Sequence, residues 1–356
     1  MFRQIINKVH LIIGLVSGSI MIIVALTGCI YAFEEEIRSF SPKQEVKIEV
    51  GEKKVSIRQI LDSVKTHQPK LKITGLMISG KPDKPITIFT KEKKNLSVNP
   101  YTAKILENEA RKQDWLATDL KLHRELLLGK IGKQIIYWNA WLFAFMLVSG
   151  FILWLPKRIK NLKQSLKIKT GASTKKLTFD LHSVGGFYAL PFLLITVATG
   201  IHIGSHGDTK GKKLQSAFQL VDNRGIIDKS LSQTSVSEPF KSIRIMLPKD
   251  SIDVLKVSIN YPSSGLKKES SYVFDQYSGK LLTQNLYSQD SLWERIWKTD
   301  VDIHTGKIGG IFGKIIAFLA SSIALILPIT GFMIWRNKRK LEQNKKNLIH
   351  HSFSIK

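Results

Sequence analysis

Two histidines in this 356-residue chain stand at the same distance from a threonine-glycine pair, and a recurring histidine can serve as a metal ligand. Thr27-Gly28 follows His10 by 17 residues. Thr199-Gly200 follows His182 by the same 17 residues. A lone histidine next to an apolar segment is usually a packed or interfacial residue, but a repeated spacing needs another explanation.

A second pair of histidines shows a different spacing, which is again kept twice. Ser149-Gly150 follows His123 by 26 residues, and Thr330-Gly331 follows His304 by 26. Each of the four histidines also lies close to the start of a long apolar segment. Four histidines in one duplicated register therefore predict ligands rather than four unrelated side chains.

The two halves of the chain carry these features in the same order. His10 and His182 differ by 172 positions. Between the histidines, Tyr101-Thr-Ala-Lys-Ile-Leu matches Tyr277-Ser-Gly-Lys-Leu-Leu at an offset of 176. We therefore predict an internal repeat, in which a unit of helix, outer domain and helix is present twice.

The elements that must position the histidines are four apolar segments separated by basic connectors. The chain has a net charge of +26 and is 43% hydrophobic, and its charge is concentrated outside these segments. The segments without Lys, Arg, Asp or Glu are Leu11–Phe33, Gln134–Pro156, Leu181–Ser205 and Ile315–Trp335. Each is long enough to span the ~30 Å hydrocarbon core of a bilayer as a helix.

Basic residues at the short connectors predict the orientation of the spans. Lysines and arginines gather near the N-terminus, between the second and third spans, and after the fourth, so we place these segments in the cytoplasm of a bacterial inner membrane. The expected order is span 1–33, outer domain 34–132, span 133–156, linker 157–178, span 179–205, outer domain 206–307, span 308–335 and cytoplasmic tail 336–356.

The two outer connectors show the patterns of small α+β domains. Residues 55–66 predict an amphipathic helix, and Lys72–Ser79, Pro85–Lys91 and Asn95–Tyr101 predict strands. In the second connector, Val254–Asn260 and Ser271–Phe274 predict strands. We expect one small sheet with a helix on one face in each connector.

No soluble catalytic constellation accompanies these domains. The sequence shows no nucleophile elbow, no zinc-protease helix motif and no phosphate-binding loop. The single cysteine, Cys29, precludes an intrachain disulfide. We read the segment around Cys29 as a retained membrane anchor rather than a lipoprotein signal, because the apolar run continues past the cysteine. If the protein moves electrons, it must receive them from another molecule.

Depth in the membrane sorts the histidines into an inner pair, His10 with His182, and an outer pair, His123 with His304. Parallel repeats are related by an axis along the membrane normal, which places equivalent residues at equal depth and facing each other. Two facing imidazoles are what six-coordinate haem iron needs above and below its plane, although a bare zinc or copper ion is an alternative. His202 is a rival outer ligand, and His206 could meet a substrate.

The combined pattern resembles the PepSY-associated transmembrane family of iron-regulated inner-membrane proteins. The residues that carry the resemblance are His10 with Thr27-Gly28, Leu122-His-Arg-Glu-Leu-Leu-Leu-Gly129, His182 with Gly185-Gly186, Ile303-His-Thr-Gly306, and the turns at Asn99–Thr102 and Asp275–Lys280. The resemblance covers essentially the whole chain. It implies a membrane α-helical bundle of four transmembrane helices in two parallel repeats, with two extracytoplasmic α+β PepSY-like domains.

The family includes ferric-siderophore reductases, in which haem in the helix bundle passes electrons to periplasmic iron chelates. The resemblance therefore implies that His10, His123, His182 and His304 ligate two haem b groups. It also implies a transmembrane oxidoreductase that acts on a ferric-siderophore or another iron chelate. Some relatives carry a fused flavin reductase domain. Here we expect the electron donor to be a quinol or a separate reductase.

Two other functions stay open from the sequence. In one, the protein is not a redox protein, and its outer domains bind or regulate an envelope peptidase or another partner. In the other, the chain is a component of a metal permease, and the histidines form a transient metal path. We expect membrane lipid around the helices and no nucleic-acid partner.

Overall fold

The computed structural model describes residues 1–40, 48–92, 95–109, 114–205, 225–234 and 239–353. The chain divides into two compact units. One contains Met1–Ser39, Trp115–Asp208 and Asp300–Lys356, and the other contains Phe40–Asp114 and Thr209–Thr299. The first unit is helical and contains all four of the candidate histidines, so it is the unit that positions the site.

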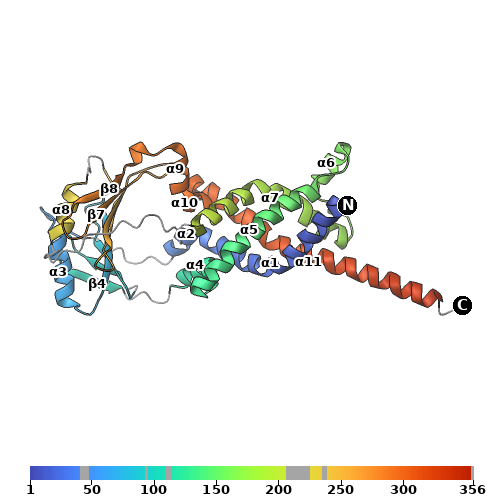
Figure 1. Ribbon diagram of the computed structural model, residues 1–356, viewed down its shortest axis with the longest axis horizontal. Coiled ribbons are helices and arrows are strands. Elements are labelled where there is room, and N and C mark those ends of the chain that lie inside the picture. The colour runs from blue at the N-terminus through green and yellow to red at the C-terminus, as the bar shows by residue number, and fades with distance from the viewer. Residues whose placement is uncertain (41–47, 93–94, 110–113, 206–224, 235–238, 354–356) are drawn as a thin grey trace. The chain divides into compact units, whose positions relative to one another are not determined.

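Four long helices form the helical unit (Figure 1). They are α1 (Phe2–Ala32), α5 (Gly129–Trp154), α7 (Thr174–Ser205) and α11 (Gly310–Phe353). Among the described residues, four helices are long and apolar enough to cross a membrane, and these are the four predicted spans. At a rise of ~1.5 Å per residue, even the 26-residue α5 exceeds the hydrocarbon thickness. The prediction of a multi-pass membrane protein is confirmed.

Small residues let these helices approach closely. Ala25 of α1, Ala189 of α7 and Ala320 and Ala324 of α11 are buried in one apolar cluster with Leu193. Lipid tails are as apolar as leucine, so close van der Waals contact between small residues is a main source of stability in such a bundle. Close van der Waals packing, rather than exclusion of water, therefore stabilises the bundle.

Short helices also belong to this unit, and two of them directly precede the spans α5 and α11. The short helices of this unit are α2 (Glu34–Ser39), α4 (Trp115–Glu125), α6 (Leu162–Ser165) and α10 (Asp300–His304), with 3-10 turns at Ile159–Asn161 and Lys307–Gly309. Gly306, with φ of 76°, turns the chain from α10 towards α11. A Cβ there would lie 2.2 Å from the carbonyl oxygen of Gly313, so only glycine fits. This turn fixes the position of His304.

The second unit contains one eight-stranded antiparallel sheet, in the order β4-β3-β2-β1-β5-β6-β7-β8. The strands are β1 (Ile73–Ser79), β2 (Ile86–Thr90), β3 (Asn95–Val98), β4 (Ile105–Glu109), β5 (Ser242–Met246), β6 (Val254–Asn260), β7 (Glu269–Asp275) and β8 (Leu281–Asn285). The prediction of two separate sheets is therefore wrong. Each connector supplies four strands, and β1 and β5 join the two sets.

The join between β1 and β5 depends on a glycine. Gly75 pairs with Met246, and a Cβ at Gly75 would lie 2.4 Å from the carbonyl oxygen of Ile245. Leu76 and Ile245 pair beside it and are fully buried. An edge strand with an apolar inner face pairs readily with another. Here the backbone N–H and C=O groups at the edge strand of one connector pair with those of the other.

The remaining helices of this unit are α3 (Ile57–His67), α8 (Ile226–Ser232) and α9 (Leu292–Lys298), with a 3-10 turn at Tyr287–Gln289. Ile60 and Val64 of α3 and Ile226 and Ile227 of α8 share one apolar core with the strands. The core therefore draws on both connectors and not on either alone.

Asp228 of α8 links the two connectors through the start of α3. Its carboxylate accepts hydrogen bonds from the backbone N–H groups of Ile57 (2.9 Å) and Arg58 (3.1 Å).

We expect the Asp228→Ala variant to lose about 1 kcal/mol of stability in this unit, since capping groups at helix N-termini contribute about that much. Thermal unfolding of the unit, followed by circular dichroism, measures the loss. An Asp250→Ala control, outside this contact, should change less, and equal losses in both variants would contradict the assignment.

Candidate functional site

The inner pair of histidines, His10 on α1 and His182 on α7, lies ring to ring. Their ring centroids are 6.4 Å apart and the ring planes make an angle of 86°. The two residues come from positions 172 residues apart in the sequence, and the packing of two long helices brings them together. The structure thus places together the two histidines that the sequence paired.

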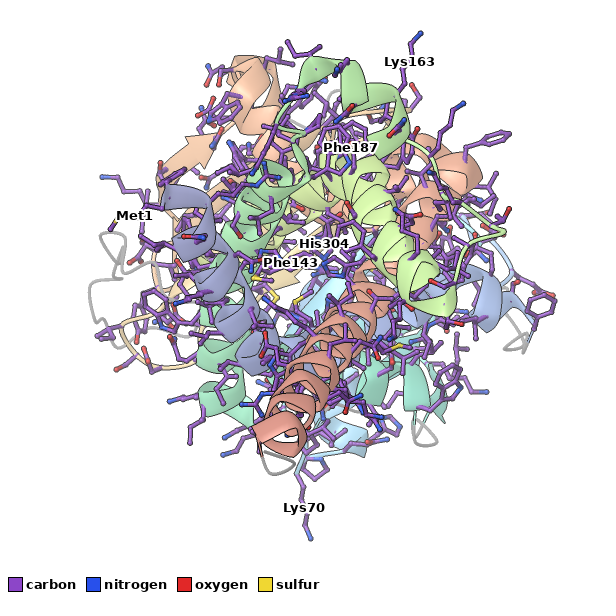
Figure 2. All side chains as sticks on the ribbon, turned by 90° about the vertical axis from the view of Figure 1, so that its right-hand side faces the viewer. Met1, Lys70, Phe143, Lys163, Phe187 and His304 are labelled. Atoms are coloured by element: carbon purple, nitrogen blue, oxygen red, sulfur yellow. The ribbon has the colours of Figure 1, made fainter. Side chains whose placement is uncertain are left out.

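The outer pair, His123 on α4 and His304 on α10, has nearly the same geometry. The ring centroids are 6.2 Å apart and the ring planes make an angle of 72°. In the view along the bundle, the position of His304 projects among the long helices (Figure 2). These two rings come from the short helices before α5 and α11, not from the spans themselves.

Every one of the four rings is held by a hydroxyl group through its Nδ1 atom. The Nδ1-to-hydroxyl distances lie between 2.8 and 3.1 Å. The partners are Ser149 for His10, Thr27 for His123, Thr330 for His182 and Thr199 for His304. These hydroxyls belong to the small-residue pairs that the sequence showed at fixed distances from the histidines, although the sequence did not show their role.

The hydrogen bonds of these hydroxyls fix the tautomer of the rings. Thr27 donates to the carbonyl of Ile23 on its own helix, and Ser149 donates to that of Met146. A hydroxyl has one proton, so each of them must accept from the ring, and Nδ1 carries the ring proton. Three of the rings also bond a backbone carbonyl through Nδ1, which only a donor can do. The lone pair is therefore on Nε2.

A glycine behind each hydroxyl makes room for the ring. A Cβ added to Gly28 would lie 3.2 Å from Cε1 of His123, and one added to Gly150 would lie 3.3 Å from Cε1 of His10. Gly200 and Gly331 stand in the same relation to the other two rings, again at 3.3 Å. A larger residue would push the ring away. The serine/threonine-glycine pairs are thus receptors for histidine rings that come from another helix.

The outer rings lie in an environment that keeps them neutral. Burial and, to a lesser extent, the neighbouring His304 lower the pKa of His123 to about 4, against the opposing effect of its hydrogen bond to the carbonyl of Val24. Burial likewise lowers the pKa of His304. Both rings are therefore uncharged at neutral pH and can offer an Nε2 lone pair.

The inner pair lines a cavity of about 900 Å³. Its wall is mostly apolar and includes small residues that leave space beside the rings, namely Gly14, Gly18, Gly150, Gly186 and Gly331. The same cavity is lined by three cationic residues, Arg3, Lys157 and Lys338. Arg3 also donates hydrogen bonds to the carbonyls of Leu153 and Leu155, which end α5. An apolar cavity with a few convergent polar groups is the usual form of a cofactor site.

His202 and His67 do not join the pairs. His202, the rival outer ligand, has its Nε2 atom 3.7 Å from the carboxylate of Asp300. His67 is exposed and bonds the carbonyl of Ser63 on its own helix. His206, the suggested substrate contact, lies outside the described residues. Within the part of the chain that the structure describes, no cluster of three or more metal-ligating side chains occurs.

A buried carboxylate near the outer pair escaped the sequence analysis. Asp119 lies on α4, four residues before His123, and its Oδ2 atom is buried without a hydrogen-bond partner among the described residues. Burial raises the pKa of Asp119. Asp300 stands four residues before His304, so the repeated Asp-to-His spacing was the available signal.

The comparison with protein families agrees with the presence of a transmembrane helical bundle. The model of the PepSY-associated TM region matches residues 7–338, which is most of the chain. A sequence search of the curated proteins gives no match. The chain therefore belongs to the PepSY-associated transmembrane family.

Proposed function

We propose that the protein is a transmembrane electron carrier with two haem b groups, one held by each histidine pair, and that it reduces a ferric chelate outside the membrane. The observation that carries the proposal is the presence of two facing pairs of imidazoles, each ring fixed by a receptor hydroxyl. The pairs lie at different levels of the bundle. His10 and Thr27, the receptor of His123, are separated along α1 by 17 residues, or about 25 Å.

The separation of the rings supports ligation of one metal by each pair. A metal–imidazole nitrogen bond is about 2.0–2.1 Å long, and a ring nitrogen lies about 1.2 Å from the ring centre. Two imidazoles that both ligate one metal ion would have ring centres no more than about 6.4 Å apart. The observed separations are 6.4 Å and 6.2 Å. Donation from Nδ1 to a fixed partner is also the usual arrangement of a ligating histidine.

The size and lining of the inner cavity favour a haem macrocycle over a bare metal ion as the bound group. Its volume of about 900 Å³ far exceeds the space that an ion requires, and its wall is mostly apolar. A haem b has two carboxylate groups, and the cavity is lined by Arg3, Lys157 and Lys338. Cations near a buried anion offset the cost of its desolvation. When bound, haem iron supplies a site that gains and loses one electron.

The chain's own residues supply orientation and the electrostatic environment. The Ser149, Thr27, Thr330 and Thr199 hydroxyls hold the rings so that each Nε2 keeps its lone pair. Burial of the outer rings keeps them uncharged, which limits the charge inside the bundle. Hydrogen bonding and low polarity around an axial ligand tune the potential of the metal.

A ferric chelate is the substrate class that fits a basic outer surface. The segment from Glu34 to Lys133 contains 21 Lys and Arg against 14 Asp and Glu, so an anionic ligand is attracted to it. Siderophore oxygens are hard ligands that hold Fe(III) better than Fe(II), so one electron loosens the iron without cleavage of the chelator.

The proposal predicts the colour of the purified protein. In mild detergent, the full chain should show a Soret band and, after dithionite, sharp α and β bands of low-spin b-type haem, with a haem content of about two per chain. Reconstituted vesicles that contain a reductant should then reduce a ferric chelate added outside. A colourless protein from haem-replete cells would contradict the proposal and would favour binding of an envelope protein by the outer unit.

A further inference from the structure

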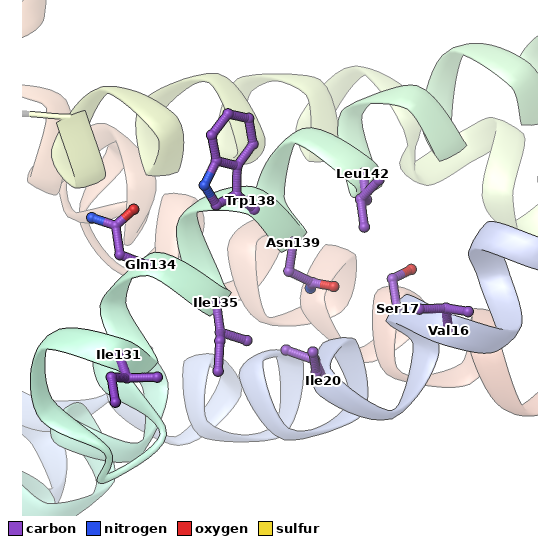
Figure 3. A pocket seen from close by; sticks show the side chains of 9 residues that line it. All are labelled: Val16, Ser17, Ile20, Ile131, Gln134, Ile135, Trp138, Asn139 and Leu142. Carbon is purple, nitrogen blue, oxygen red and sulfur yellow. The ribbon is translucent and has the colours of Figure 1, made fainter.

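A second cavity, of about 370 Å³, lies between α1 and α5 and contains neither histidine pair (Figure 3). Its lining is formed by Val16, Ser17, Ile20, Ile131, Gln134, Ile135, Trp138, Asn139 and Leu142. The volume falls in the range of about 300–1,000 Å³ that is typical of small-molecule sites. None of the nine lining residues is charged.

The cavity opens towards the lipid. Val16 is 66% exposed and Trp138 is 63% exposed, and both belong to spans whose outer surface faces hydrocarbon. Its α1 residues lie between His10 and Thr27, and therefore at a depth between the two histidine pairs. A molecule that enters here must come from the bilayer, and a charged lipid headgroup would find no counter-charge in this lining.

Asn139 gives the cavity a specific polar group. The residue is only 4% exposed, and its Oδ1 atom is buried with no hydrogen-bond partner among the described residues. Figure 3 shows its amide turned towards Ser17 and Ile20 of α1. An unpaired buried acceptor is unfavourable, and the hydrocarbon core of a membrane offers no water to pair with it. A ligand with a hydroxyl donor would remove this cost.

We propose that this cavity binds the hydroquinone ring of a membrane quinol. One ring hydroxyl donates a hydrogen bond to Asn139, the ring lies against the Trp138 indole, and the apolar tail extends into the lipid. Acyl chains have no donor for Asn139, and phospholipid headgroups are charged. The preference for a quinol over other uncharged lipid alcohols rests on the proposed function, which requires a lipid-soluble source of electrons.

Binding can be measured without any electron transfer. The full chain in phosphatidylcholine nanodiscs is titrated with radiolabelled decylubiquinol under reducing conditions, and the label retained per protein is counted. We expect saturable binding that weakens at least tenfold in Asn139→Leu, which keeps the size of the side chain but removes both polar atoms. Trp138→Leu should weaken binding too, whereas Trp141→Leu serves as the matched control. Trp141 is on the same helix, is 49% exposed and does not line the cavity.

Several results would overturn the proposal. These are no saturable binding, equal binding by wild type and Asn139→Leu, equal losses in the Trp138 and Trp141 variants, or equal displacement of the label by dioleoylglycerol, which would mark a general lipid crevice. The haem content of each sample is recorded in parallel. Haem without quinol binding removes only this inference, and quinol binding without haem removes only the proposed function.

Discussion

If the proposed function is right, the His182→Ala variant should purify with about half of the low-spin haem signal of the wild type, because the proposed inner site loses one of its two histidines while the proposed outer site is intact. The His304→Ala variant should lose the other half. The double variant should retain almost none. Pyridine haemochrome content and the reduced α band measure this directly, and the two single variants should differ in midpoint potential because different sites survive.

The control for this series is His67→Ala. His67 is exposed and bonds only its own helix, so its loss should leave the haem signal unchanged. His202→Ala tests the rival outer ligand, which contacts Asp300 rather than a facing ring. A loss of half the haem in His202→Ala with full retention in His304→Ala would reverse the outer assignment.

The Gly331→Val variant is expected to disturb the inner site although no ligand is changed. A Cβ at this position would already lie 3.3 Å from Cε1 of His182, and the two methyl groups of valine extend further. The ring must move, and its hydrogen bond to Thr330 is strained. Changes in such supporting groups typically cost 10–100-fold in metal affinity, so retention of the haem proposed for the inner site should fall by roughly that factor.

A matched substitution separates this effect from general damage to the bundle. Gly185 is also a glycine of a span, but a Cβ there would meet its nearest neighbour, Ile323, at an ordinary 3.8 Å. Gly185→Val should therefore retain both haems. Haem loss during dialysis against a haem-binding apoprotein gives the readout. If both valine variants lose haem equally, the receptor role of Gly331 is not supported.

Much of the membrane unit could be predicted from the sequence, because long uncharged segments leave few alternatives in a bilayer. The pairing of His10 with His182 could also be predicted, since a repeat fixes which residues are equivalent. The sequence alone could not show which of His202 and His304 faces His123. Only the packing of α7 against α10 shows that His202 contacts Asp300, whereas the ring of His304 bonds Thr199 and faces His123.

The second unit, which contains the sheet, was predicted less well, for reasons that lie in particular residues. β6 was predicted with its observed bounds because Val254–Asn260 alternates clearly. β5 is only five residues long, and β8 ends in polar residues, so neither gave a clear pattern. The joining of β1 to β5 depends on contact between Gly75 and Ile245, which are 170 residues apart. No local pattern contains that information.

The receptor hydroxyls have a consequence for how such a protein can be assembled. His10 and His123 are held by Ser149 and Thr27, which all lie before the linker, and His182 and His304 are held by Thr330 and Thr199, which all lie after it. Each half thus supports its own two rings, while each facing pair takes one ring from each half. A polypeptide of half this length could therefore complete both pairs by twofold association with a copy of itself. Each half of the present chain already contains every histidine and hydroxyl that such a homodimeric ancestor would need.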